Sequence, residues 1–134
     1  MKEIYVDANV FLRFVLWDPP ELAGEAEKFF RNSIEGREKL VTSDLVIAEI
    51  VWTLESFYEK SKSQIAEFVQ GILSTPNLTV ENADLVAVAV KIYEEKNVDF
   101  IDAYSYAYMK KHKISGIKTF DRKHFKRFPD IEMT

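Results

Sequence analysis

The sequence of 134 residues contains no cysteine and only two histidines, His112 and His124. The absence of cysteine excludes disulfides, thiolate metal sites and cysteine nucleophiles. Both histidines lie in basic surroundings, KKHK and RKHFKR, without the paired spacing of a zinc motif. A zinc site or a Ser-His-Asp triad therefore has little support, and any metal site must use oxygen or imidazole ligands.

The sequence also lacks an apolar run long enough to span a bilayer. The first residues, MKEIYVD, enter a strand-like run without the basic and apolar regions of a signal peptide. Hydrophobic residues make up 47% and charged residues 30%, which is ordinary for a soluble globular protein and argues against disorder. We therefore expect a cytoplasmic protein without a membrane association, folded as a single domain over residues 1–134.

The formal net charge of −4 hides an uneven distribution of charge along the chain. Eight of the 18 Lys and Arg residues lie between Lys110 and Arg127, where Asp121 is the only acid. A basic C-terminal third in an otherwise acidic chain indicates a polyanionic ligand. A solvated charged face explains the same run equally well when the run is taken alone.

Hydrophobic periodicity and turn residues predict an alternation of strands and helices. Residues 2–6 read as a strand and 10–16 as a helix, which WDPPE ends before Pro20 opens the next helix. Ser43 or Asp44 is placed to cap a long helix. The other predicted helices cover residues 21–34, 45–60, 62–73, 82–97 and 98–113, the other strands 39–44, 78–81, 114–120 and 131–134, and a helical turn 121–128. This order implies an α/β fold with a mostly parallel sheet, in which ligands bind beyond the carboxyl ends of the strands.

Two acids follow predicted strands directly. Asp7 comes after the strand at residues 2–6, and Asp121 comes after GIKTF. Each acid can be read as a cap for the helix that follows it. Because carboxyl ends of parallel strands share one edge of a sheet, we expect the two side chains to converge there.

Two further acids lie on apolar helices. Glu49, within LVIAEIVWTL, is either on a narrow solvent face or a partly buried functional acid. Asp102 follows three residues after Asp99, where a cap and an acid in the first turn both suit a helix start. Acids that meet at one sheet edge repel unless a cation neutralises them, and carboxylate oxygens suit Mg²⁺ or Mn²⁺. The pattern therefore indicates metal-assisted phosphodiester hydrolysis.

Four segments carry a family resemblance. YVDANVFLR, SDLVIAEIVWTL, VDFIDAYSYAYMKKH and IKTFDRKHF are similar to the four acidic motifs of PIN domains, in the same order and over nearly the whole chain. The likeness is closest to the VapC-type toxins of prokaryotic toxin–antitoxin pairs. The resemblance implies a three-layer α/β/α fold with a mostly parallel central sheet of four to five strands, and a ribonuclease that depends on Mg²⁺ or Mn²⁺.

The resemblance also implies a role for each acid. Asp7, Glu49, Asp102 and Asp121 take the places of the catalytic, metal-site acids. As a hypothesis, Asp7, Asp102 and Asp121 hold the ion, while Glu49 orients or deprotonates the attacking water.

Several polar residues near these acids are expected to support the site. Asn9 matches the polar residue two after the first Asp, and Thr119 matches the hydroxyl residue two before the last. Asp99 is expected to cap its helix and to act at most in the outer sphere of the metal. Three basic residues near the C-terminus are predicted to position the RNA backbone, namely Lys118, Arg122 and Lys123.

The resemblance further implies a homodimer and a small VapB-like antitoxin that reaches into the acidic pocket. Apolar residues of the early helices can serve such contacts or simply fill the core: Phe11, Phe14, Val15 and Trp17.

Three other functions remain open at this point. One is a PIN-domain nuclease that processes RNA or cuts DNA without an antitoxin. Another is a non-catalytic PIN-like binding module, although such modules typically lose one or more of the acids retained here. A phosphotransferase of the haloacid dehalogenase type needs a second Asp two residues after the first, where this chain has Asn9.

Overall fold

The computed structural model describes residues 2–134, which form an α/β protein with parallel strands. The chain divides into two compact units, one up to Ala83 and the other from Asp84 to Thr134. Our expectation of one domain over residues 1–134 stays a prediction. Within residues 2–134, helices long and apolar enough to cross a membrane are absent.

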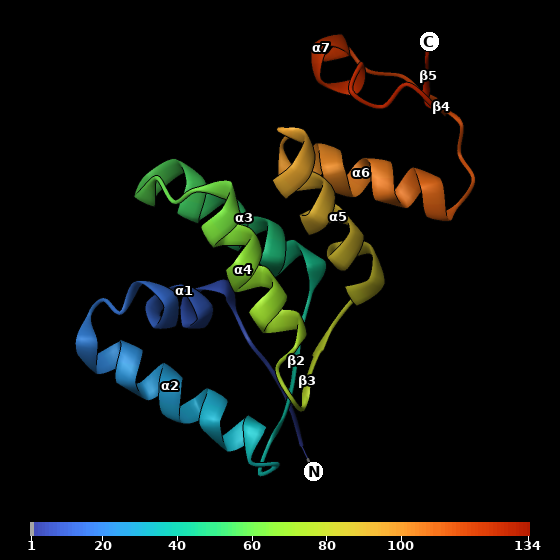
Figure 1. The fold of residues 1–134 in the computed structure, drawn as a ribbon. Coiled ribbons are helices and arrows are strands. Elements are labelled where there is room, and N and C mark those ends of the chain that lie inside the picture. Colours follow the sequence, from blue (N-terminus) through green and yellow to red (C-terminus); the bar gives the residue numbers. More distant parts are fainter. Residues whose placement is uncertain (1) are drawn as a thin grey trace. The chain divides into compact units, whose positions relative to one another are not determined.

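The first unit is built on a three-stranded parallel sheet with the order β1-β2-β3. Figure 1 shows these strands side by side. Each of the two crossovers contains a pair of helices, as parallel pairing requires a long connection. The strands are β1 (Glu3–Tyr5), β2 (Lys39–Thr42) and β3 (Leu78–Val80), and the helices are α1 (Ala8–Leu16), α2 (Pro20–Ile34), α3 (Asp44–Tyr58) and α4 (Lys62–Leu73).

Local capping sets the starts of these helices. Asp7 caps α1, because its side chain accepts a hydrogen bond from the Ala8 amide. Ser43 caps α3 in the same way, which decides between the two residues predicted for that position. At α4, Ser61 and Gln64 form a reciprocal capping box. These caps satisfy amides that would otherwise lack partners at the helix starts.

The core of the first unit is apolar and involves both crossovers. Leu40 in the central strand is fully buried, as are Ile47 and Ile50 on α3. On α1, Phe11 is buried and stacks on Phe30 of α2 with ring centroids 5.1 Å apart. The aromatic residues at the start of the chain are therefore not all core residues. Phe11 is buried, whereas Phe14 is half-buried and Trp17 is exposed.

Hydrogen bonds join the carboxyl ends of β1 and β2 beside Asp7. The buried Thr42 hydroxyl donates to the Val6 carbonyl at 2.8 Å, and the Val6 amide donates to the Val41 carbonyl at 2.8 Å. The two hydroxyls of Tyr5 and Ser43 lie 3.0 Å apart at the same ends. These bonds hold the backbone from which the Asp7 side chain projects.

We expect Thr42→Val to lower the free energy of unfolding by about 1–2 kcal/mol, because the Val6 carbonyl loses a buried donor. Chemical denaturation followed by circular dichroism measures this loss. Thr42→Ser keeps the hydroxyl and is the matched control. A valine variant as stable as the serine variant would show that the hydrogen bond contributes nothing.

The second unit contains three helices and a small sheet of its own. Its strands, β4 and β5, are parallel, with Gly116 opposite Glu132 and Ile117 opposite Met133. Tyr93, Val98 and other apolar side chains form its core. The elements are α5 (Ala83–Lys96), which begins at the unit boundary, α6 (Phe100–Lys111), β4 (Gly116–Ile117), α7 (Arg122–Phe125) and β5 (Glu132–Met133).

The strand count differs from the expectation of four to five strands in one central sheet. Three strands form the larger sheet, and β4 and β5 form a separate pair. Only Gly116 and Ile117 of the predicted strand 114–120 are extended and paired, because the chain turns soon afterwards. There the Thr119 hydroxyl accepts a hydrogen bond from the Asp121 amide at 3.0 Å, which favours a turn over a strand.

Candidate functional site

In the first unit, Asp7 lies where β1 leads into α1. One carboxylate oxygen caps the helix at the Ala8 amide, at 2.8 Å, and the Asn9 amide nitrogen is 3.5 Å from the other oxygen. Asp7 and Asn9 are both exposed. The cap therefore uses one carboxylate oxygen of an exposed side chain, and the second oxygen is contacted by the Asn9 amide.

Glu49 also belongs to the first unit, on α3. This helix follows β2, the direct neighbour of β1 in the sheet. Glu49 is exposed, as expected for the solvent-face alternative rather than for a partly buried acid. Its catalytic role stays a prediction.

In the second unit, three of the predicted residues, Asp99, Asp102 and Asp121, lie near His124, which was not predicted. Ligand atoms of Asp99, Asp102 and His124 all lie within 4.8 Å of one another. The His124 Nδ1 atom is 2.7 Å from an Asp121 carboxylate oxygen and 3.5 Å from Asp102 Oδ2. We call Asp99, Asp102, Asp121 and His124 the acidic cluster.

Asp99 occupies the position before α6 without capping it. Within the described residues, its side chain makes no capping hydrogen bond to that helix. The expected capping contact is therefore absent, and the carboxylate lies instead with Asp102 and His124. An exposed carboxylate that is not used in a capping hydrogen bond is available to a cation.

Asp102 is the most enclosed acid of the cluster, since its side chain is only 18% exposed whereas that of Asp121 is 50% exposed. Its buried Oδ2 atom has no hydrogen-bond partner among residues 2–134. Burial raises the pKa of Asp102, and the charges of Asp99 and Asp121 raise it further against the opposing effect of His124. Such a carboxylate is destabilised when ionised and lacks a compensating partner.

Sequence reasoning missed His124, which was set aside for want of a zinc motif. The available signal was its spacing, because Asp121 and His124 lie three residues apart in a segment predicted as a helical turn. The structure places both at α7, with His124 half-buried. In its neutral form the ring donates from Nδ1 to Asp121, which leaves Nε2 as an acceptor.

The residues of the acidic cluster fit a divalent cation. Asp99, Asp102 and His124 offer two carboxylates and an imidazole within reach of one ion, and the Asp121 carboxylate lies beside His124, so the cluster has the oxygen and nitrogen donors that Mg²⁺ and Mn²⁺ accept. The Oδ2 of Asp102 would gain from a cation, because it is buried without a hydrogen-bond partner among residues 2–134 and its pKa stays raised despite the opposing effect of His124.

Contacts within the second unit hold in place the two segments that carry the cluster. Asp102 lies on α6, while Asp121 and His124 lie near α7. The Tyr106 hydroxyl on α6 donates to Asp130, at 2.8 and 3.0 Å to its two carboxylate oxygens. The Tyr106 ring also stacks on Phe128, with centroids 4.1 Å apart, so α6 is fastened to the chain after α7.

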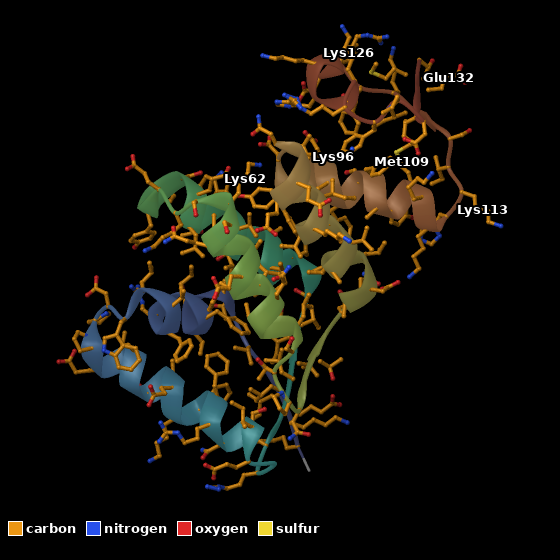
Figure 2. The ribbon with its side chains drawn as sticks, in the orientation of Figure 1. Lys62, Lys96, Met109, Lys113, Lys126 and Glu132 are labelled. Carbon is orange, nitrogen blue, oxygen red and sulfur yellow. The ribbon has the colours of Figure 1, made fainter. Side chains whose placement is uncertain are left out.

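The basic residues predicted to contact RNA are all exposed. Arg122 and Lys123 open α7 directly after Asp121. Lys118 donates to the Thr134 carbonyl at 3.4 Å and lies over the Phe120 ring. Figure 2 shows Lys126 beside α7, where several other nitrogen-bearing side chains extend outward. Contact of these side chains with RNA stays a prediction.

The predicted acids are thus distributed over both units. The second unit brings Asp102 and Asp121 together, with Asp99 beside them, while Asp7 and Glu49 belong to the first. The action of all four acids on one substrate stays a prediction.

Comparison with known proteins gives a family for this arrangement. The profile of the PIN domain matches residues 4–131. A protein described as VapC ribonuclease, from Aquifex aeolicus strain VF5, is 30% identical over 118 residues, which cover 88% of this chain and 87% of that protein. Both findings agree with the resemblance carried by the four acidic segments. The chain belongs to the PIN domain family.

Proposed function

We propose that this protein is an endoribonuclease that depends on Mg²⁺ or Mn²⁺ and is the toxin of a VapBC-type toxin–antitoxin pair. The observation that carries the proposal is the acidic cluster, in which the buried Oδ2 of Asp102 has no hydrogen-bond partner among residues 2–134. Similarity to a VapC ribonuclease supports RNA as the substrate. No observation favours DNA cleavage, phosphotransfer or a purely binding role over this reading.

The reaction is hydrolysis of a phosphodiester bond, in which water attacks phosphorus and the bond to the leaving oxygen breaks. When bound, a divalent ion supplies Lewis-acid stabilisation of the phosphate oxygens and favours ionisation of the attacking water. Asp102 and Asp121 would hold this ion, together with Asp7. Glu49 would orient the water and accept its proton.

These roles rest on different supports. For Asp102 and Asp121, the support is their proximity to each other and to Asp99. For Asp7 and Glu49, it is the order of acidic motifs shared with the family. Exposure of Glu49 leaves its carboxylate accessible to water, as a general base requires.

The neighbouring polar residues would position substrate and ligands. Asn9 would orient the Asp7 carboxylate, and Thr119 would hold the turn that carries Asp121 through its hydrogen bond to the Asp121 amide. Asp99 would act from the outer sphere of the ion. The RNA backbone would contact the exposed basic residues Lys118, Arg122 and Lys123.

Partners and the finer architecture complete the proposal. Family membership favours a three-layer α/β/α arrangement, a homodimer in the cytoplasm and a VapB-like antitoxin. The first unit offers an apolar groove of about 450 Å³ suited to a helical partner, between α1, α2 and α4. It is lined in part by Phe14, Phe30 and Phe68.

Asp7→Asn tests the catalytic role of the first acid. Asparagine is as good a helix cap as aspartate, so α1 and the fold should be retained. Loss of one carboxylate should reduce Mg²⁺- or Mn²⁺-dependent cleavage by about 10²-fold or more. The measurement is cleavage of end-labelled single-stranded RNA, with and without EDTA.

Asp18→Asn is the matched control, since it removes one exposed negative charge from the same unit while keeping the carbonyl that accepts from Arg13. This control should cleave like the unmodified protein. Undiminished cleavage by the Asp7 variant, or cleavage that persists in EDTA, would remove the proposed mechanism.

A further inference from the structure

Phe120 is the most exposed large hydrophobic side chain in the described chain, with 94% of its surface accessible. A single exposed apolar residue is by itself ordinary. Phe120 differs because it immediately precedes Asp121 and is held on an anchored turn among cationic groups. Each of these features bears on what the ring can bind.

The backbone on both sides of Phe120 is fixed. Ile117 in β4 pairs with Met133, and the buried Phe125 anchors α7. Between them, the Thr119 hydroxyl accepts the Asp121 amide hydrogen at 3.0 Å. The turn therefore projects the Phe120 ring into solvent from an ordered segment, which lowers the entropy lost when a ligand packs against it.

The chain around the ring carries three cationic residues and one acid, Asp121. The Lys118 ammonium lies 5.3 Å from the centroid of the Phe120 ring, a cation–π distance. Arg122 and Lys123 follow after Asp121 and are exposed. An aromatic face bordered by cations matches the two parts of a nucleotide, an aromatic base and an anionic phosphate.

We propose that Phe120 is a stacking platform for one unpaired base of the RNA strand, with Lys118, Arg122 and Lys123 on the adjoining phosphates. This inference rests on the proposed function, because it takes RNA as the ligand, and it adds a contact to the base. It predicts a preference for single-stranded RNA, whose bases are free to stack, over duplex RNA.

A protein partner at this ring is the other class of ligand, and the surroundings disfavour it. Aromatic side chains at protein interfaces lie within an apolar core from which charged residues are depleted. The exposed chain neighbours of Phe120 are instead charged: Lys118, Asp121, Arg122 and Lys123.

Binding of fluorescein-labelled single-stranded oligoadenylate, followed by anisotropy, tests the proposal. Ca²⁺ replaces Mg²⁺ and Mn²⁺ to suppress cleavage, and a gel confirms that the oligonucleotide stays intact. Phe120→Ala and Phe120→Leu should weaken binding by about 5- to 100-fold, because base stacking is lost. Phe120→Trp should keep binding within a few-fold, because an aromatic face remains.

Phe57→Ala is the matched control, since Phe57 is also exposed but lies on α3 between Glu55 and Glu59. It should leave RNA binding unchanged. An oligonucleotide of the same length with abasic positions separates stacking from charge. The Ala variant and the unmodified protein should have the same affinity for the abasic oligonucleotide.

The salt dependence gives a second readout. Phe120→Ala should lower affinity without changing the slope of log K against log salt, whereas Lys118→Gln should reduce the slope by about one. Equal RNA affinity of the Ala variant and the unmodified protein would overturn the proposal, and so would a leucine variant that binds as tightly as tryptophan. Loss of self-association or of a protein partner, with RNA binding intact, would assign the ring to a protein interface instead.

Cleavage assays in Mn²⁺ keep this inference separate from the proposed function. Binding that depends on Phe120, without any cleavage, would support the stacking site and count against the nuclease. Cleavage with unchanged binding and unchanged product positions in the Ala variant would support the nuclease and overturn the stacking site.

Discussion

Asp102→Asn is expected to reduce metal-dependent RNA cleavage by about 10²- to 10³-fold. The same substitution should not lower the stability of the metal-free protein. Asp102 is the enclosed acid of the cluster, and its Oδ2 has no hydrogen-bond partner among residues 2–134. The same carboxylate that would hold a cation is therefore unfavourable for folding when no cation is bound. Function and stability should respond in opposite directions to its removal.

The sign of the stability effect follows from the pKa of Asp102. Burial, with the neighbouring charges of Asp99 and Asp121, raises this pKa above the value of the unfolded chain. A group that binds its proton more tightly in the folded state weakens folding at every pH above the raised pKa, where it is ionised. The neutral amide of asparagine removes that penalty at neutral pH.

Thermal unfolding with EDTA and with Mn²⁺ measures both effects. The unmodified protein should gain stability on adding Mn²⁺, because the ion binds the folded state, and the Asp102 variant should not. Asp84→Asn is the matched control, as it removes an exposed carboxylate of the same unit that pairs with Lys111 at 2.8 Å. A cation shift retained in the Asp102 variant would place the ion elsewhere.

His124→Ala is expected to weaken Mn²⁺ binding by about 10- to 100-fold, the usual cost of losing a residue that orients a metal ligand. Its Nδ1 is 2.7 Å from the Asp121 carboxylate, which is half exposed and otherwise free to rotate into solvent. We therefore expect His124 to act as a positioning residue that directs Asp121 toward Asp102. Calorimetric titration with Mn²⁺ measures the affinity without relying on turnover.

Two conservative variants separate positioning from direct ligation by His124. The amide nitrogen of His124→Asn lies near the place of Nδ1 and can still donate to Asp121, so this variant should keep affinity within a few-fold. His124→Gln extends its amide toward the place of Nε2 and should behave like alanine. The reverse order would identify the imidazole as a direct ligand, and equal affinities for all variants would remove His124 from the site.

Some helix boundaries were predicted well from sequence, because their causes are local, whereas α1 begins at Ala8, two residues before its predicted start, and α6 covers Phe100–Lys111 rather than residues 98–113. The helix predicted over residues 62–73 is α4, Lys62–Leu73, with a capping box between Ser61 and Gln64 directly at its start. Pro20 opens α2 as predicted, since its missing amide costs nothing at the first turn of a helix. Strand pairing was predicted less well, because residues 114–120 had the composition of a strand while only two of them pair.

The candidate site shows the same division at the level of single residues. The sequence predicted the four acids as candidates from their place after strands and on apolar helices, and their catalytic roles stay predictions. The side-chain partners of Asp99 and Asp121 were not predicted from the sequence. Asp99 stands where a cap was expected yet turns to Asp102 and His124, and no spacing rule indicates that choice.

By itself, the sequence determined the α/β class, some of the helix ends and the acidic motifs that mark a PIN domain, because these depend on periodicity, capping and composition within short segments. Only the tertiary structure decided that β4 pairs with β5, that the Asp102 carboxylate is enclosed, and that His124 contacts Asp121 beside it. Asp102 and His124 are 22 positions apart along the chain, and packing such as the Tyr106 contact with Asp130 brings their elements together. Contacts of that kind depend on shape and burial in the folded chain, which no local pattern contains.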